Sequence, residues 1–357
     1  MKKAVKISAI FMAVCLIVSM LPGCGASSED TDTRTVVDIT GAEVEIPAKV
    51  DEVINLNPFG CQIMIGLGLE DYLVGISPDT FETAWLEEMS PQAKEIPTYS
   101  DETAAEALLA AKPDVVFSQD PDVTEDLRSK GISCITLGYL TLDDYKFNIN
   151  LIGEILGGSA KEKTDLYLDY LNGKIKEIGS ALSENITEQE TLYYINANGD
   201  KGFYKTSGAG STTDYCAQLC EITLATASLI DFPESKVDAE ALLATNPKNV
   251  IIGGRYQHVI YDELFAADEW QQISAIQNDN VFKIPMGFAA WDRYSLETAL
   301  LIPWMASVVY PEYYEFDAVN EIIEFYKTFM GYELSVEQAE YMIAGLTPSG
   351  EKEIASR

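Results

Sequence analysis

Histidine and cysteine are scarce in this chain. Its 357 residues include one histidine, His258, and six cysteines. A single histidine excludes the usual histidine-rich zinc or manganese site, so we predict no metal-ligating set. Besides Cys15 and Cys24 near the start, four cysteines are dispersed along the chain, too few for a disulfide scaffold of this size: Cys61, Cys134, Cys216 and Cys220. Cys216 and Cys220 are one helical turn apart and could form a metal clip. With no CxxC motif or histidine beside them, buried small hydrophobic residues are the preferred interpretation.

Positive charge is also in short supply. The chain has 24 Lys and Arg against 57 Asp and Glu, a formal net charge of −33. Nucleic-acid binding is therefore excluded as a function, because phosphate neutralisation requires a basic surface. An anionic ligand would need a local arginine or lysine to reverse the field.

The only long apolar run is residues 7–18, and it is shorter than the roughly 20 residues that a membrane span needs. Lys2, Lys3 and Lys6 precede it. A charged segment followed by a short apolar one is the layout of a secretory signal. We therefore expect an exported protein whose remaining length folds in water.

The four residues 21–24, Leu-Pro-Gly-Cys, resemble a bacterial lipobox, in which the cysteine is lipidated and becomes the new N-terminus. We predict a signal peptide over residues 1–23, a lipid on Cys24 and a polar tether over residues 24–35. The protein would then lie outside the cytoplasm, attached to the outer face of the cell membrane. A plain secretory signal with an incidental cysteine is the alternative.

The globular part contains an internal repeat. Residues 105–117 read AEALLAAKPDVVF and residues 239–251 read AEALLATNPKNVI, an offset of 239 − 105 = 134 positions. Each copy predicts a short helix, a proline that ends it and a buried parallel strand. Two similar α/β halves follow from this, in keeping with a length that exceeds one core.

Strand, turn and helix signals alternate around the two copies. In the first half we expect a strand at 52–56, a turn at 57–60, a helix at 61–69 and a strand at 72–76. In the second we expect a strand at 191–195, a loop at 196–210, a helix from Ser211, a strand at 280–284, a loop at 285–293 and an amphipathic helix at 295–309. This alternation predicts two doubly wound α/β lobes, whose ligands lie beyond the carboxyl ends of the strands.

A long helix is predicted between the halves. Over residues 161–182, apolar residues recur three and four apart at Leu168, Leu171, Ile175, Ile178 and Leu182. The expected organisation is an N-terminal lobe over 36–160, a connecting helix over 161–185, a C-terminal lobe over 186–346 and a polar, frayed tail over 347–357.

Several segments together resemble the substrate-binding proteins of ABC importers for ferric siderophores, haem, cobalamin and, in some members, molybdate or tungstate. They include TVVDITGAEVEIPAKVDEVINLNPFGCQIMIGLGLEDYLVGI at 35–76, both repeat copies, DEWQQISAIQNDNVFKIP at 268–285 and WDRYSLETALLIPWMASVVYPE at 291–312. The resemblance covers about residues 35–330. It implies two lobes bridged by a long helix, a ligand in the cleft between them and no catalytic residues or cofactor, since the bound ligand is cargo.

The resemblance also implies a partner, the ABC permease dimer with its ATPase. In the family, one glutamate on each lobe docks on the permease, and the matching positions are Glu106 and Glu240, one in each repeat copy. One carboxylate per lobe suits a partner with two symmetric halves. The alternative is that each merely stabilises the first turn of its helix.

The strand-end rule and the resemblance together nominate the ligand contacts. From the first lobe they are Asn57, Phe59 and Gln119. From the second they are Asn196, Asn198, Tyr204, Arg255, Tyr256, His258, Trp291, Arg293 and Tyr294. Arginines and aromatic side chains of this kind suit carboxylate or catecholate oxygens and provide rigid walls.

A ferric siderophore is the preferred ligand, because such complexes dominate the family. Molybdate or tungstate, cobalamin and haem stay open. An enzyme on the same fold is disfavoured, since there is no nucleophile elbow and Gly208 and Gly210 lack the rest of a dinucleotide motif. A surface sensor or adhesion lipoprotein is the other alternative.

Overall fold

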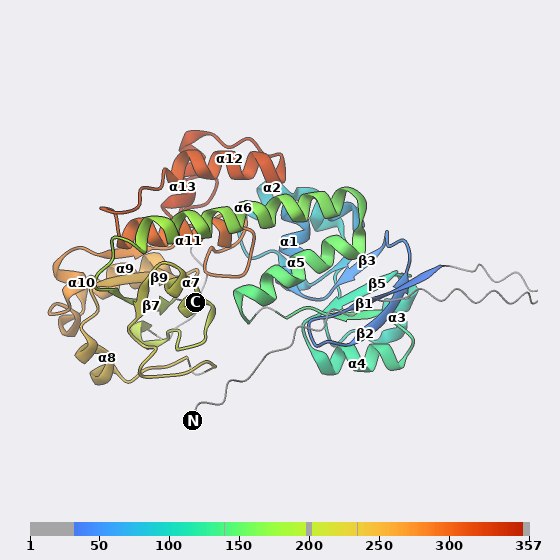
Figure 1. Ribbon diagram of the computed structural model, residues 1–357, viewed down its shortest axis with the longest axis horizontal. Helices are drawn as coiled ribbons and strands as arrows, with labels where there is room; N and C mark the ends of the chain where they lie inside the picture. Colours follow the sequence, from blue (N-terminus) through green and yellow to red (C-terminus); the bar gives the residue numbers. More distant parts are fainter. Residues whose placement is uncertain (1–31, 139, 198–201, 234, 353–357) are drawn as a thin grey trace, which may run out of the picture. The chain divides into compact units, whose positions relative to one another are not determined.

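The computed structural model describes residues 32–138, 140–197, 202–233 and 235–352 (Figure 1). The chain divides into two units, residues 1–32 and 33–357, and all elements below belong to the second. The predicted signal peptide, Cys24 and Asn198 lie outside the described residues. Within the described ranges, no helix combines the length and the apolarity that crossing a membrane requires.

The first lobe is built on a parallel sheet of order β4-β3-β5-β6. Its strands are β3 (Val53–Asn55), β4 (Leu73–Ile76), β5 (Val115–Ser118) and β6 (Cys134–Thr136). Its helices are α1 (Pro58–Gly66), α2 (Ala84–Met89), α3 (Ala105–Ala110), α4 (Pro121–Ser129) and α5 (Leu142–Leu156). Apart from Val74, every strand residue is buried, as expected for a sheet with helices on both faces.

An antiparallel hairpin precedes this sheet. Strand β1 (Thr33–Val37) pairs with β2 (Glu43–Pro47), so the chain is already in a strand two residues before the predicted end of the tether at Thr35. The buried Asp38 explains why the strand forms there. Its carboxylate accepts bonds from the turn amides of Thr40 and Ala42 and pairs with Arg128 of α4 at 2.5 Å.

The second lobe repeats the arrangement with a parallel sheet of order β10-β9-β7-β8. Its strands are β7 (Glu190–Asn196), β8 (Ile222–Leu224), β9 (Asn249–Gly253) and β10 (Val281–Lys283). Its helices are α7 (Thr212–Leu219), α8 (Ala239–Thr245), α9 (Gln257–Ala266) and α10 (Ser274–Gln277). The repeat copies form α3 with β5 and α8 with β9. The predicted fold class, two α/β lobes joined by a long helix, is confirmed.

The connecting helix is α6 (Gly158–Leu182), and it packs against α5 along one half of its length and against α11 (Thr298–Val309) along the other (Figure 1). The chain reverses direction between α5 and α6 at Gly157, whose φ of 68° lies in the left-handed region that favours glycine. Helix α6 is therefore held along its length rather than spanning free between the lobes.

Two predictions about the C-terminal part are wrong. The helix predicted at 295–309 begins at Thr298, and all its residues except Ser307 and Val308 are buried, so it is not amphipathic. It is covered by α6, α7 and α12 (Ala318–Met330). The tail was expected to fray from Thr347, yet Thr347 N donates to Glu351 O at 2.8 Å and Leu346 pairs with Lys352. Residues 353–357 lie outside the described ranges.

Of the last two helices, α12 (Ala318–Met330) contacts α11 and is bonded to the connecting helix, and α13 (Val336–Ile343) packs on α12. Tyr170 and Lys174 of α6 both bind Glu321 of α12, the lysine at 2.7 Å. Trp85 of the first lobe donates its indole N–H to Leu346 O at 2.8 Å. The predicted C-terminal lobe, residues 186–346, therefore includes two helices, α12 and α13, that are not part of its α/β layer.

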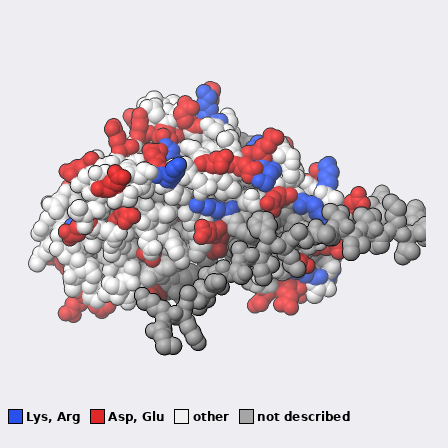
Figure 2. Space-filling view, viewed as in Figure 1, with Lys and Arg blue, Asp and Glu red and all other residues white. Residues whose placement is uncertain are grey.

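Cys61, Cys134, Cys216 and Cys220 are free and buried, which confirms the burial predicted for Cys216 and Cys220. Burial raises the pKa of the Cys61 thiol to about 11 and that of Cys216 to about 12. These thiols are therefore protonated near neutral pH and act as small apolar side chains. Acidic side chains are spread over the face seen in Figure 2, interspersed with basic ones, in keeping with the net negative charge.

Candidate ligand-binding pocket

A pocket of about 280 Å³ lies where strand β7 ends. Phe59 of α1 comes from the first lobe, and the other lining residues come from β7, the segments that follow it and the segment 292–294. This is the edge that the strand-end rule predicts for a ligand site. Its described lining consists of Phe59, Tyr194, Asn196, Thr206, Ser207, Gly208, Ser211, Thr212, Thr213, Phe232, Pro233, Ser235, Asp292, Arg293 and Tyr294.

Hydroxyl groups form one wall. Ser211 caps α7 by accepting a bond from Asp214 N at 3.2 Å, and Thr212 and Thr213 follow it in the first turn. Ser207 Oγ lies 3.1 Å from Thr213 Oγ1. The segment before the helix requires a glycine at position 208, since a Cβ there would lie 2.5 Å from the carbonyl oxygen of Ile230. The wall offers donors and acceptors without net charge.

Asp292 forms part of the pocket lining. Tyr194 donates its hydroxyl to Asp292 Oδ2, while Oδ1 is buried without a hydrogen-bond partner among the described residues. Burial, and then the charge of Asp292, raise the pKa of Tyr194 well above its usual value. The phenol therefore stays a donor, and one carboxylate oxygen retains its capacity to accept a bond.

Arg293 links the two lobes across the pocket. Its Nε is 3.3 Å from Glu82 Oε2, and its guanidinium carbon lies 5.9 Å from the centre of the Phe59 ring. Both partners belong to the first lobe, whereas Arg293 follows the last strand of the second. The arginine is therefore oriented by an ion pair and by a cation–π contact.

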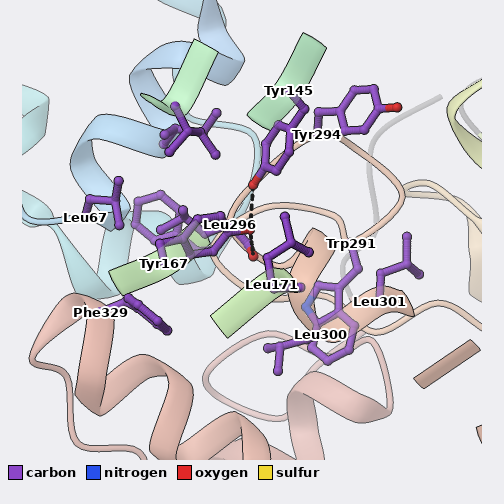
Figure 3. Close-up of a cluster of buried hydrophobic side chains, with 14 of the residues drawn as sticks. Leu67, Tyr145, Tyr167, Leu171, Trp291, Tyr294, Leu296, Leu300, Leu301 and Phe329 are labelled. Carbon is purple, nitrogen blue, oxygen red and sulfur yellow. Dashed lines mark hydrogen bonds between the residues drawn. The ribbon is translucent and has the colours of Figure 1, made fainter. Parts of the chain in front are cut away.

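The segment that carries these residues is fixed in the core. The Tyr294 ring stacks on Tyr145 of α5 with centroids 5.3 Å apart. Tyr145 donates to Ser295 O at 2.7 Å. Tyr167 of α6 donates to Leu296 O at 2.8 Å, and both tyrosines and Leu296 are labelled in Figure 3. Glu297 is also buried and accepts bonds from the Tyr326 hydroxyl and from Ala289 N, at 2.7 and 3.0 Å.

The structure brings four of the predicted contacts to this pocket: Phe59, Asn196, Arg293 and Tyr294. Asn57 instead caps α1, accepting from Gly60 N at 3.0 Å and donating to Gln119 Oε1 at 2.9 Å. Gln119 itself is exposed outside the lining. A buried capping asparagine has its polar atoms committed to the fold, so Asn57 has a structural role here.

The remaining predicted contacts lie away from the lining. Trp291 is fully buried in the core and His258 is buried with Nε2 2.9 Å from Gly345 O. Burial also lowers the pKa of His258, which favours the neutral ring. Tyr204 packs on Trp270, Tyr256 packs on the second core, and Arg255 is exposed before α9. For Trp291 and His258 the structure thus shows packing in place of the predicted exposure to a ligand.

Sequence reasoning missed most of the hydroxyl wall and the two acidic side chains at the pocket, Asp292 and Glu82. Ser207, Thr212 and Thr213 lie in or beside the predicted loop, where polar residues are common and carry no distinct signal. Asp292 adjoins the nominated Arg293. Phe232 was also missed, because its 52% exposure at the pocket is visible only in the structure.

A second hollow, of about 370 Å³, lies at the opposite edge of the second sheet, where β7 and β9 begin at Glu190 and Asn249. Ligands of doubly wound folds bind beyond the carboxyl ends of strands, so its position favours the first pocket. Within the described residues, no group of three or more His, Cys, Asp or Glu side chains is placed to hold a metal ion.

A model of the periplasmic binding protein family matches residues 53–286. By sequence, the chain is 22% identical over 298 residues to YvrC of Bacillus subtilis, an uncharacterised ABC transporter substrate-binding lipoprotein, covering 78% of this chain and 90% of that one. Similar solved structures include a periplasmic solute binding protein of Veillonella parvula, with a TM-score of 0.73, 21% identity and coverage of 89% and 99%. Another is MolA of Haemophilus influenzae bound to molybdate, with a TM-score of 0.71, 21% identity and coverage of 85% and 99%. At these identities the structural likeness concerns the fold.

Tyr194→Phe is expected to lower the free energy of unfolding by about 1–3 kcal/mol, because it removes the donor to the partly buried Asp292 carboxylate. Urea unfolding at neutral pH measures the change. Tyr341→Phe is the control, since that hydroxyl bonds Glu337 at the surface and its loss should change stability little. Equal stability of the Tyr194→Phe variant and the wild type would contradict the assigned bond.

Proposed function

This chain belongs to the periplasmic binding protein family, and we propose that it captures a ferric siderophore between its two lobes for an ABC importer. As a member it is an extracytoplasmic binding protein and not an enzyme. Proteins of this kind hand their ligand to a membrane permease that an ATPase drives. The ligand itself is the part that we propose.

The observation that carries the proposal is the composition of the pocket. Hydroxyls of Ser207, Thr212 and Thr213 can hydrogen-bond to the organic shell of a complex, and the rings of Phe59 and Phe232 can pack against it. Both lobes contribute, through Phe59 and Arg293 with its partner Glu82. A complexed metal brings its own ligands, so such a wall recognises the shell rather than the ion.

Molybdate is the second candidate, favoured by the fold likeness to MolA. A tetrahedral oxyanion would use the same hydroxyls and Arg293 as donors. Tungstate, cobalamin and haem complete the set of ligands to be compared.

Glu106 and Glu240 are the proposed docking residues. Each is exposed in the first turn of its helix, α3 or α8, at equivalent places in the two lobes. Such a pair suits arginines on the two halves of a permease dimer. A carboxylate in the first turn also stabilises its own helix. This local role needs no partner and is compatible with docking.

Cys24 is the proposed lipid attachment site, with palmitate among its acyl chains. The signal-like segment and the cysteine lie outside the described residues, so the proposal rests on the sequence and on the fact that YvrC is a lipoprotein. An anchor would keep the receptor near its permease and raise their effective concentration.

A thermal-shift panel on the full chain tests the ligand. Ferric siderophores should raise the melting temperature in proportion to the logarithm of their concentration, because they bind only the folded state. Apo-siderophores serve as controls. A shift with molybdate or tungstate alone would show that the preferred ligand is wrong.

The docking proposal predicts that Glu106→Ala combined with Glu240→Ala abolishes most uptake while leaving ligand affinity unchanged. Uptake of labelled ligand by cells and binding by the purified protein measure the two effects. Glu125→Ala with Glu324→Ala is the matched control, since it removes two exposed carboxylates from α4 and α12. Uptake at the wild-type level by the Glu106 and Glu240 double variant would contradict their assignment as docking residues.

Cys24→Ser should release the protein from the membrane fraction and stop incorporation of labelled palmitate. Fractionation of cells and metabolic labelling check this, with Cys15→Ser as control. Retention of the Cys24→Ser protein in the membrane fraction would point to attachment by another route.

A further inference from the structure

The charged groups at the pocket are few and lie close together. Among the described residues that line it, Arg293 is basic and Asp292 is acidic, and the others are neutral. Glu82 reaches Arg293 from the first lobe. Arg293 and Asp292 are therefore the charged groups of the described lining, and Glu82 is the ion-pair partner of Arg293.

The positive charge of Arg293 is already compensated. The Arg293 and Glu82 side chains are only 26% and 17% exposed, so their ion pair is less screened by solvent than a surface pair. Glu82 is held by its neighbour. Thr83 caps α2 by accepting from Leu86 N at 3.2 Å, and donates to Phe288 O at 2.8 Å. The carboxylate is therefore presented from a fixed segment rather than from a flexible loop tip.

The negative charge of Asp292 is not compensated in the same way. Tyr194 gives it one neutral donor, and Oδ1 has no hydrogen-bond partner in the described part of the chain. Two carboxylates against one guanidinium leave a surplus negative charge at the pocket. The net charge of the whole chain, −33, has the same sign.

We propose that Glu82 is a specificity-determining residue, which neutralises Arg293 and so makes the pocket select a neutral or cationic complex over an anionic one. The inference rests on the proposed function, and it specifies which chemical class of ferric siderophore the pocket binds. Three hydroxamates bring just enough negative charge to neutralise a ferric ion, whereas three catecholates bring twice as much and leave the complex strongly anionic. The pocket is therefore suited to ferric trihydroxamates, because an uncompensated anion would meet Asp292 and Glu82.

The test compares two ferric complexes on the full chain, a trihydroxamate and a tricatecholate, by quenching of tryptophan fluorescence. The wild type should bind the trihydroxamate at least about tenfold more tightly. Glu82→Gln keeps the shape of the side chain and frees the charge of Arg293. It should tighten tricatecholate binding about tenfold and change trihydroxamate binding by less than about twofold.

Glu87→Gln is the matched control. Glu87 pairs with Lys94 at 2.6 Å on the exposed side of α2, so the substitution makes the same change in net charge away from the pocket. It should alter neither affinity. An equal response to Glu87→Gln and Glu82→Gln would mean that net charge, and not the ion pair with Arg293, sets the preference, and would overturn the proposal.

Two other outcomes also overturn it. One is a wild type that binds the tricatecholate as tightly as the trihydroxamate, a comparison that needs no variant and stands even if Glu82→Gln does not fold. The other is a folded Glu82→Gln protein with unchanged selectivity. A chain that binds neither ferric complex, while molybdate or another panel ligand stabilises it, instead overturns the proposed ferric ligand.

Discussion

Two tyrosine hydroxyls in the core hold the segment that carries Asp292, Arg293 and Tyr294. Tyr145 of α5 and Tyr167 of α6 lie 2.6 Å apart and also reach the carbonyls of Ser295 and Leu296. Two hydroxyls have two hydrogens for these three contacts, so the group acts as one shared network rather than as separate bonds. Because both helices pack along each other, the network fixes the pocket residues relative to the long helix itself.

The anchoring of residues 292–294 by these tyrosines also explains why the pocket is lined from both lobes. The chain after β10 leaves the second sheet, passes the tyrosines and continues into α11, which is buried on nearly every side. Residues 292–294 are thereby brought beside Phe59 and Glu82 of the first lobe. Holding this connection so deep in the protein costs free energy, because it buries the Glu297 carboxylate. Burial also raises the pKa of Glu297.

Most of the fold could be predicted from the sequence, because its signals are local. The helix, proline and apolar strand of each repeat copy are written within thirteen consecutive residues, and both copies form as expected. The stripe at Leu168, Leu171 and Ile175 predicted α6 within three residues at each end, since the helix runs from Gly158 to Leu182 and was expected over 161–185. The helix after residue 295 was described less well, since apolar spacing alone cannot reveal that α6, α7 and α12 cover its remaining faces.

The pocket could be predicted only in part. Arg293 and Tyr294 were found because they lie at the end of the loop that follows a predicted strand, but Glu82 is distant in sequence and nothing in its neighbours marks it. Trp291 and His258 have the residue types of a binding site, yet long-range packing placed them in the core and against Gly345 O. Residue type and strand position therefore locate the edge of the sheet, and tertiary packing decides which side chains reach the ligand.

The helices α12 and α13 have a mechanical consequence. Helix α12 is bound to α6 through Lys174 and Glu321, α13 packs on α12, and the turn after α13 accepts a bond from the indole of Trp85 in the first lobe. A change in the angle between the two lobes would therefore have to break these side-chain contacts in addition to bending the long helix.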